Sequence, residues 1–578
     1  MDRNLLLAIV LSVLIILGFQ LYFQSVTKDK VRKPGKPVIT EKTLRKAKPS
    51  PEQQPGKKTA TTGSGQETKA PIEPTRESLK QFEQTKTGPV PETFVTINCP
   101  KYEATLSSQG ARIISFKLKD YKKTLEGDEL IDLFRSKRPD TAGPSIMLTW
   151  EERTFDDRNL AYESDSKEKV IDLSGESARK SISFRAKTKD GLALVKTYTF
   201  HPGNYTVGVS YTLTNETGQK RNYLVTFPWK KFYPKETDKN RYSWNSAEFL
   251  LNNEIKDIYF SKIEEDRDYS GEIKWAGLGS TYFLKCMVPE GWQARKMTLF
   301  KPTKEGVAEL WLRAGSLDLS SGSSASRNLL LYLGPKEHTA LIKAGHELSR
   351  SLFYSRYWVF DLMAQYLMNF LRYSHYGFNV FGLRIPGTGN WGWDIIILTI
   401  IIKVLFIPLT HKQTKSMKRM QDLQPKIAEM KAKYKDDKQA QNKAMMDLFK
   451  EHNVNPIGGC WPMFLQLPVF IALYQALLYA IELRHAYFVC IPSIYLCLKD
   501  LSAPDPYYIT PILMGGSMVL QQWLTPATGD PTQRKMMMIM PVVFTYIFLS
   551  FPSGLVVYWL VSNLLSIGQQ LLTNTLTK

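Results

Sequence analysis

The residue of clearest chemical interest is Lys403, which lies inside an apolar run from Ile395 to Leu409. A cation in the middle of a membrane-spanning helix costs about 2.5 to 3.5 kcal/mol on insertion scales. Such a cost indicates a water-filled cavity, a partner charge or a substrate path. Alternatively, the side chain extends to the membrane surface, because only about 10 Å of helix separates it from the end of the run. The chemistry of the residue alone leaves both interpretations open.

Uncharged polar side chains also occur within the apolar runs of the second half of the chain. Thr399 lies one turn before Lys403 on the same helix face, and Gln466 and Asn563 lie in two later runs. These groups could line a hydrophilic groove, or they could form hydrogen bonds between helices, which is their more common use. No Asp or Glu lies deep in any run. Lys403 is therefore better suited to attract anionic or polar guests than to relay protons.

The sequence contains no pattern for nucleotide hydrolysis, metal binding or nucleophilic catalysis. The P-loop pattern G-x-x-x-x-G-K-[ST] is absent, as are H-E-x-x-H and G-x-S-x-G. We therefore expect no catalytic residue, no metal and no cofactor. The net charge of +21 is spread over several regions without a zinc-finger or RNA-binding motif, so we expect no specific nucleic acid partner.

The cysteines do not indicate a metal or redox motif, because no two of them form a C-x-x-C pair. We expect five unpaired thiols and no disulfide, with disulfides on an oxidising side of the membrane as the alternative. The five are Cys99, Cys286, Cys460, Cys490 and Cys497.

Long apolar runs predict six membrane-spanning helices. Leu5 to Phe23 is long enough to cross a hydrocarbon core of about 30 Å. It lacks the cleavage site of a signal peptide, so we expect an uncleaved anchor over residues 1–24. The other five spans are predicted at Trp391–Leu409, Pro456–Ile481, Tyr507–Leu524, Met536–Phe551 and Leu555–Leu572.

Two regions of different character follow the anchor. Residues 25–92 are rich in Lys, Pro, Thr, Gln and Gly, which predicts a flexible linker. From residue 93 to 344, apolar and polar residues alternate and turn sequences recur, which predicts an antiparallel β-sandwich. The clearest alternating positions are Ile114, Phe116, Leu118, Val207, Val209, Tyr211 and Leu213.

A helix is predicted over Arg350–Tyr376, within a segment of residues 345–385 that precedes the membrane core. Its aromatic and apolar residues leave one polar stripe, as in helices that lie in the membrane interface. The alternative is an ordinary helix packed on the sandwich. The polar stripe consists of Asp361, Gln365, Asn369 and Arg372.

The loop His411–Asn455 sets the predicted topology. It carries 11 Lys and Arg against 6 Asp and Glu and lies close to two spans, so we place it in the cytoplasm. The β domain then lies outside, and both termini lie inside. Basic residues from Lys28 to Lys33 oppose this orientation, but long domains are translocated largely regardless of charge.

The same loop, residues 411–455, is predicted to form a helical hairpin broken at Asp436-Asp437. Its methionines form a flexible apolar stripe of the kind that accepts varied partners. We favour the simpler interpretation, in which the two helices pack their apolar stripes against each other, and both can hold. The methionines are Met417, Met420, Met430, Met445 and Met446.

Short motifs recur in order across about 200 residues and resemble the YidC family of membrane protein insertases, of the YidC/Oxa/Alb superfamily. The anchor and large β domain resemble the Gram-negative branch in layout. The matching segments are Leu331–Pro335, Asn390–Trp393, Ile407–Thr410, Leu423–Ile427, Asn455–Cys460, Gln466–Pro468, Asp505–Ile509, Pro511–Gly515, Phe551–Leu555 and Val561–Asn563.

This resemblance implies a polytopic α-helical membrane protein with six transmembrane helices and a large periplasmic antiparallel β-sandwich domain. Five of the helices, within residues 386–578, would form an insertase core around a hydrophilic groove. The family's groove cation is usually Arg, and Lys403 occupies the matching position. A client-contacting aromatic residue of the family matches Trp559, beside Tyr558. Lys keeps the charge of Arg without its planar donor fork.

The resemblance also implies an inner-membrane location and a function without ATP hydrolysis. A client's polar segment would be held near Lys403 while its apolar segment enters lipid. The implied partners are nascent membrane proteins, the Sec translocon, the ribosome or targeting machinery, and membrane lipids.

Two other classes compete with this interpretation. A transporter or channel using Lys403 predicts inverted repeats and paired broken helices, and the sequence shows no internal repeat. A β-domain receptor that is only anchored by helices needs neither six spans nor an intramembrane cation. An insertase accounts for both features.

Overall fold

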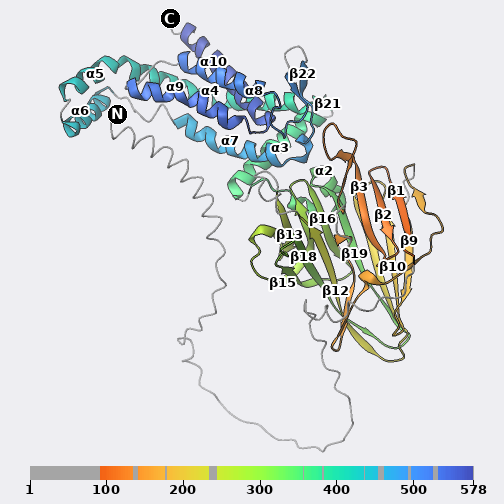
Figure 1. Cartoon of the computed structure of the whole chain (residues 1–578). Helices are drawn as coiled ribbons and strands as arrows, with labels where there is room; N and C mark the ends of the chain where they lie inside the picture. Colours follow the sequence, from red (N-terminus) through yellow and green to blue (C-terminus); the bar gives the residue numbers. More distant parts are fainter. Residues whose placement is uncertain are drawn as a thin grey trace, which may run out of the picture. The chain divides into compact units, whose positions relative to one another are not determined.

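A computed structural model describes residues 91–134, 141–175, 179–233, 244–355, 357–380, 383–434, 437–452, 461–491, 496–524 and 531–576. The predicted anchor and residues 25–90 of the predicted linker lie outside these ranges. Strands dominate the described chain up to residue 335, and helices dominate it afterwards (Figure 1).

The smaller of the two main sheets has five strands in the order β4-β3-β2-β1-β8. It is antiparallel except where β1 pairs with β8 in parallel, so the prediction of a wholly antiparallel sandwich was wrong at this edge. The strands are β1 (Phe94–Asn98), β2 (Tyr102–Ser107), β3 (Arg112–Lys122), β4 (Leu130–Asp132) and β8 (Val170–Asp172).

The larger sheet has fourteen strands. Twelve follow the order β6-β5-β12-β18-β17-β15-β16-β19-β11-β10-β9-β7, and β13 joins β14 to β15. The strands are β5 (Met147–Trp150), β6 (Arg153–Asp156), β7 (Glu163–Ser164), β9 (Lys180–Lys187), β10 (Leu192–Phe200), β11 (Thr206–Asn215), β12 (Arg221–Phe232), β13 (Asn245–Leu251), β14 (Glu254–Tyr259), β15 (Arg267–Ser280), β16 (Phe283–Glu290), β17 (Ala294–Phe300), β18 (Val307–Leu319) and β19 (Ser324–Pro335).

Side-chain alternation along the strands agrees with the prediction in most places. The predicted inward residues of β11, from Val207 to Leu213, are all buried. In β3, Phe116 and Leu118 are buried, but Ile113 is buried in place of the predicted Ile114. The register of β2 against β3 shifts between Thr105 and Leu106, and this irregularity changes which residues face the core.

The helical part begins with one short helix, α2, followed by a 3-10 turn and then α3. The helices are α2 (His338–Ala344), α3 (Trp358–Tyr376), α4 (Trp391–Asp422), α5 (Gln424–Lys433), α6 (Lys438–Glu451), α7 (Trp461–Tyr479), α8 (Ile509–Leu524), α9 (Pro531–Phe548) and α10 (Ser553–Leu576). Short 3-10 turns are η2 (Asp157–Asn159), η4 (Phe260–Lys262), η5 (Leu348–Ser351) and η6 (Ile481–Leu483).

Helix α4 is longer than the predicted second span, because it continues from residue 409 to Asp422 without a break. Residues 409–422 contain no Gly or Pro, so nothing local ends the helix there. The loop predicted to start at His411 is therefore helical from its beginning. Asp437 caps the N-terminus of α6, so the helix-breaking role of the predicted acidic pair is confirmed at this residue.

Among the described residues, two stretches are long and apolar enough to cross a membrane by themselves, Trp391–Pro408 and Ser553–Leu572. Two shorter apolar helical stretches, Gln466–Tyr479 and Met538–Phe548, accompany them. Many large apolar side chains on these helices are exposed, including Leu405 at 71% and Tyr546 at 77%. Exposed apolar surface of this extent is typical of helices that face lipid.

Two small hairpins were not predicted. One consists of β20 (Gly377–Val380) and β21 (Leu383–Pro386), between α3 and α4. The other consists of β22 (Val489–Ile491) and β23 (Leu496–Leu498), between α7 and α8. Their strands are too short for sequence alternation to distinguish them from loops.

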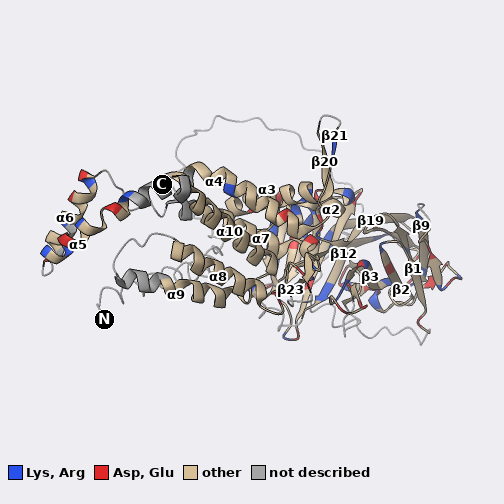
Figure 2. Ribbon diagram, turned by 90° about the horizontal axis from the view of Figure 1, so that it is seen from above, with Lys and Arg blue, Asp and Glu red and all other residues tan. Residues whose placement is uncertain are grey.

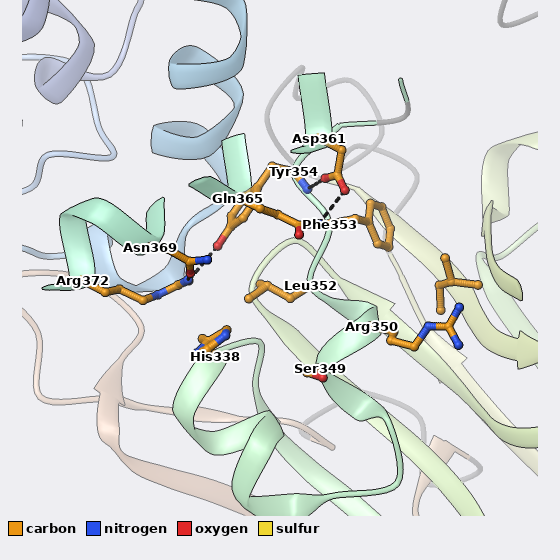
Figure 3. A pocket seen from close by; sticks show the side chains of 11 residues that line it. His338, Ser349, Arg350, Leu352, Phe353, Tyr354, Asp361, Gln365, Asn369 and Arg372 are labelled. Atoms are coloured by element: carbon orange, nitrogen blue, oxygen red, sulfur yellow. Dashed lines mark hydrogen bonds between the residues drawn. The ribbon is translucent and has the colours of Figure 1, made fainter. Parts of the chain in front are cut away.

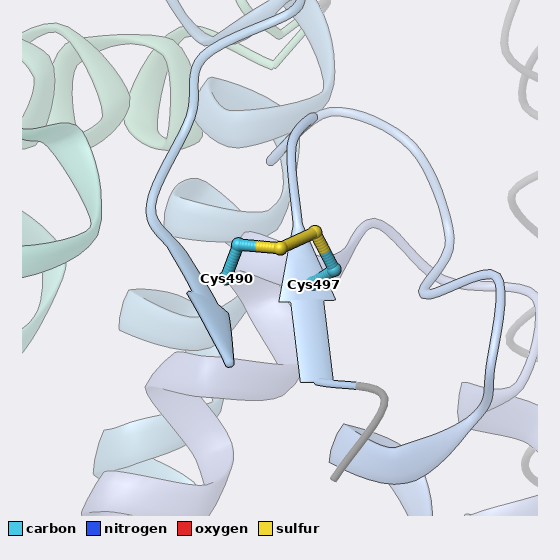
Figure 4. Close-up of a disulfide and its surroundings, with 2 residues drawn as sticks. All are labelled: Cys490 and Cys497. Carbon is cyan, nitrogen blue, oxygen red and sulfur yellow. A yellow bond between two sulfur atoms is a disulfide. The ribbon is translucent and has the colours of Figure 1, made fainter. Parts of the chain in front are cut away.

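A disulfide between Cys490 and Cys497 joins β22 to β23 (Figure 4). The two residues are direct register partners in the hairpin. The prediction that all five cysteines are unpaired was therefore wrong for this pair, because spacing along the chain does not reveal which thiols a hairpin brings together. Cys99 and Cys286 are free and buried, as expected, and Cys460 lies outside the described residues.

In the topology predicted from the sequence, the hairpin lies on the side of the membrane opposite the basic loop of α5 and α6, outside the cytoplasm, so we expect this disulfide to form in cells. In spheroplasts, a membrane-impermeant maleimide should modify Cys490 and Cys497 only after reduction. In a Cys490→Ser control, Cys497 should react without reductant. Equal reaction of the unaltered chain with and without reductant would show two free thiols.

Candidate functional site

Helix α10 organises the predicted site, since it contacts α4, α7 and α8. It carries a series of polar side chains directed at these three neighbours. Ser566 reaches α4, Ser562 reaches α7, and Asn563 reaches α8. The predicted groove residues therefore come from helices that do touch one another.

Lys403 on α4 is partly buried, and its Nζ donates a hydrogen bond to Ser566 Oγ at 2.7 Å. Ser566 Oγ in turn donates to the carbonyl oxygen of Ser562 at 2.9 Å. Within the described part of the chain, no carboxylate forms an ion pair with Lys403. The ammonium group thus keeps donor capacity and an uncompensated charge between α4 and α10.

Gln466 and Thr399 differ in whether their side chains contact the polar groups around Lys403. Gln466 Nε2 on α7 lies 3.5 Å from Ser562 Oγ, so it extends the polar cluster around Lys403. Thr399 is 1% exposed, and its hydroxyl donates to Ile395 O of its own helix at 2.6 Å. Thr399 is therefore satisfied within α4 and does not present a free hydroxyl to a guest.

The two predicted aromatic residues of α10 are both packed inside the bundle. Tyr558 is 1% exposed. Trp559 is partly buried among three phenylalanines, with ring-centroid distances of 4.8 Å to Phe470, 5.3 Å to Phe548 and 6.0 Å to Phe544. An apolar segment could therefore meet Trp559 only at the exposed edge of this aromatic cluster.

Several polar residues make hydrogen bonds between helices, which was the alternative to a groove lining. Asn563 Nδ2 donates to Ser517 Oγ of α8 at 3.0 Å. Gln569 Nε2 donates to Thr410 Oγ1 of α4, and Gln570 Nε2 donates to Leu524 O of α8, both at 2.7 Å. These bonds hold α10 to its neighbours, so Asn563 has a structural role in this arrangement.

Sequence reasoning missed Ser562 and Ser566, which contact Gln466 and Lys403. Their spacing of four residues places them on one face of α10, and that spacing was a usable signal. Serine is common in membrane helices, so the signal was weak without knowledge of the facing helix.

A second polar cluster lies at the N-terminal end of α4. Asp394 is 0% exposed and accepts hydrogen bonds from Ser374 Oγ at 2.5 Å, Thr388 Oγ1 at 2.6 Å and His375 Nδ1 at 3.0 Å. The His375 ring also stacks on Trp391, with centroids 4.0 Å apart. These contacts fasten the end of α3 to the start of α4, the helix that carries Lys403.

Arg372 of α3 forms a buried ion pair with Glu482, just after α7. Its Nη2 lies 2.8 Å from Glu482 Oε1 and 2.7 Å from Tyr354 Oη. Burial lowers the pKa of the Arg372 guanidinium, but the charges and hydrogen bonds of Glu482 and Tyr354 together outweigh this effect and raise the pKa above its ordinary value. This pair fastens α3 to the end of α7.

Arg372 also borders a cavity of 380 Å³ beneath α3 (Figure 3). Asp361 Oδ1 accepts the backbone amides of Tyr354 and Ser355 at 2.6 and 3.1 Å, and Gln365 donates to Oδ2 at 2.7 Å. Burial raises the pKa of the Asp361 carboxyl. The polar stripe of α3 therefore faces this cavity and is largely engaged within the protein.

The face of α3 beside the polar stripe is exposed and apolar. Trp358 is 78% exposed, Tyr366 69%, Tyr373 61% and Leu362 46%. A helix that turns its polar stripe inward and its aromatic residues outward is the inverse of a water-facing helix. This arrangement supports the membrane-interface interpretation over an ordinary helix packed on the sandwich.

The methionine-containing loop forms a small core of its own. Leu423, Ile427 and Leu448 are buried against one another, with Met420 and Met445 packed around them. The simpler interpretation, two helices packed by their apolar stripes, is therefore confirmed. Met446 is 54% exposed and Met430 is partly exposed, so both remain available to a partner. The side chain of Met417 is not among those that the structure describes.

Comparisons with known proteins cover both parts of the chain. A family model described as the 60Kd inner membrane protein matches residues 384–578, and one described as the YidC periplasmic domain matches residues 94–369. The membrane protein insertase YidC of Syntrophus aciditrophicus is 34% identical over 99% of this chain and 99% of its own length. The protein of the same name from Geobacter sulfurreducens is 37% identical, over 82% of this chain and 85% of its own length.

Among solved structures, an active YidC insertase with its first transmembrane domain resolved is similar to this chain. The match covers 83% of this chain and 94% of that one, with 19% sequence identity and a TM-score of 0.37. A galactose mutarotase-like protein from Lactobacillus casei matches 42% of this chain, with 13% identity and a TM-score of 0.30.

Proposed function

Because the chain belongs to the YidC family of membrane protein insertases, we propose that it moves transmembrane segments of newly made proteins from the cytoplasm into the inner membrane. The family places the protein in the inner membrane, with a β-rich domain in the periplasm. The family is one of insertases and not of enzymes, in agreement with the prediction from the sequence.

The observation that carries the mechanism is the position of Lys403. Its ammonium group lies between α4 and α10, bonded to the neutral hydroxyl of Ser566 and without a carboxylate partner among the described residues. A buried cation without an acid attracts anionic and polar guests. The polar groups of Gln466 and Ser562 lie beside it and extend a hydrophilic surface along α7 and α10.

In this mechanism, the polar leading segment of a client enters the bundle from the cytoplasm and is held near Lys403. The cation and the neighbouring polar groups lower the cost of removing that segment from water. The client's apolar segment then passes along α7 and α10, close to the Trp559 cluster, into lipid. Apolar burial of about 25 cal/mol per Å² supplies the driving force, so no nucleotide is needed.

The finer topology belongs to the same proposal. The chain crosses the membrane six times, with both termini and the α5–α6 loop in the cytoplasm. The excess of basic residues in that loop supports this orientation. Met430 and Met446 would then meet clients delivered by the ribosome or targeting machinery, and the chain would act alone or with the Sec translocon.

Reconstitution tests the proposal directly. The purified protein in liposomes, without nucleotide, should insert a small client with one apolar segment and an acidic N-terminal tail. Insertion is scored as protection of the tail from added protease. Protection no greater than in protein-free liposomes would contradict an autonomous insertase, and a transporter would then be the better interpretation.

A further inference from the structure

The β20–β21 hairpin has two chemically different faces. Phe378 pairs with Ile385, and Asn379 pairs with Arg384. Paired residues of an antiparallel hairpin lie on the same face, and successive residues alternate between faces. Phe378, Ile385 and Leu383 therefore share one apolar face, and Asn379 and Arg384 share the polar face.

The apolar face of the hairpin is uncovered. Leu383 is 69% exposed, Phe378 40% and Ile385 38%. The two strands form a sheet of their own and pair with no other described strand. Figure 2 shows β20 and β21 standing out from the neighbouring helices. An isolated hairpin is marginally stable in water, so this apolar face needs a partner.

The base of the hairpin is held firmly at the end of α3. Gly377 has φ +78°, and a Cβ atom there would lie 2.3 Å from Ile385 O. A Cβ atom at Gly387 would lie 2.0 Å from His375 O. The Thr388 amide also donates to Ser374 O at 2.9 Å. These close backbone contacts fix where the hairpin leaves the protein.

That position is close to the start of a candidate membrane span. A candidate span begins at Trp391, only five residue steps and at most about 18 Å beyond Pro386. The exposed aromatic side of α3 leads into the hairpin, because the Tyr373 and Phe378 rings lie 6.4 Å apart edge to face. The apolar face of the hairpin thus continues a surface that already suits the membrane interface.

We propose that the β20–β21 hairpin lies flat in the headgroup region of the inner membrane, in the leaflet that faces the periplasm in the proposed topology. Its apolar face, which includes Leu383 at the start of β21, rests on the acyl chains, and Arg384 contacts lipid phosphate on the other face. The hairpin does not pass deeper, because the unpaired backbone groups on its strand edges cannot be satisfied in hydrocarbon. Lipid suits the site better than a protein partner because the surface adjoins a span and carries a single cation.

Spin labels on adjacent residues can test this placement in the full chain. Leu383→Cys, Arg384→Cys and Val170→Cys would be labelled separately in nanodiscs of phosphatidylethanolamine and phosphatidylglycerol. Val170 is a 63% exposed residue of the β domain and supplies the water-facing reference. A labelled chain without an added cysteine supplies the background, since Cys99 and Cys286 are buried.

The measured quantity is the ratio of collisions with oxygen, which concentrates in lipid, to collisions with a water-soluble nickel chelate. The ratio at residue 383 should exceed the Val170→Cys reference several-fold, and the ratio at residue 384 should stay close to the reference. Equal ratios at residues 383 and 170 would place the hairpin in water. Low collision rates with both probes would indicate cover by a protein, and high oxygen ratios at both hairpin positions would indicate full immersion. Each of these three results would overturn the proposal.

Discussion

Reversing the charge of Lys403 should reduce insertion of a client with an acidic tail by at least about tenfold, which corresponds to about 1.4 kcal/mol. Two unit charges 4 Å apart interact by about 4 kcal/mol at an effective dielectric constant of 20. Lys403→Glu replaces this attraction with a repulsion of similar size. Even a largely hydrated contact therefore loses enough free energy for a tenfold effect. The measurement is protease protection of the tail in liposomes.

The client's charge provides the sharpest control. Lys403→Glu should insert a client with a basic tail at least as well as the unaltered protein, because the sign of the interaction is reversed for that client. Lys403→Arg keeps the cation and should insert the acidic client nearly as well as Lys403 does. Equal losses for acidic and basic clients would indicate misfolding of the bundle and would remove the electrostatic role.

Ser566→Ala separates the charge of Lys403 from its hydrogen bond. This change removes the acceptor at 2.7 Å from Nζ and leaves the cation in place. If Lys403 acts through its charge, insertion of the acidic client should change little. A loss as large as that of Lys403→Glu would instead show that the α4–α10 hydrogen bond is the important feature.

The sequence predicted the general fold because its strongest signals are local. Apolar runs mark the helices from Trp391 onward, and alternation marks strands such as β11. The parallel pairing of β1 with β8 could not be predicted, since it joins segments about 75 residues apart without a local signal. The short hairpins were missed because three or four residues are too few to show a period.

The sequence predicted several residues of the candidate site, but not which of them contact one another. Lys403 stood out because a charge inside an apolar run is rare. Its partner Ser566 could not be identified, because that contact depends on which faces of α4 and α10 meet. For the same reason, Asn563 could not be distinguished as a hydrogen-bond donor to Ser517 instead of a groove residue. Helix rotation is determined by packing, which a periodic pattern only partly encodes.

The buried pair Arg372 and Glu482 should be the most sensitive structural contact near the membrane boundary. Their side chains are 10% and 5% exposed, so removing one leaves a buried charge without its partner. Such a loss costs about 3 to 5 kcal/mol. Arg372→Ala or Glu482→Ala should therefore accelerate hydrogen exchange of α3 by about a hundredfold or more, if exchange occurs through local opening.

Two variants separate the effect of the pair from a general weakening of the protein. Arg350→Ala removes an exposed ion pair with Glu347, which should cost less than about 1 kcal/mol and change exchange little. The double change Arg372→Met with Glu482→Leu removes both charges together and should restore most of the protection, because neither charge is left buried alone.

Similar exchange in the Arg372→Ala and Arg350→Ala variants would show that the buried pair does not hold α3 to the end of α7. In that case the hydrogen bonds to Asp394 would be the main attachment of α3 to the bundle, and Asp394→Asn should then produce the larger acceleration.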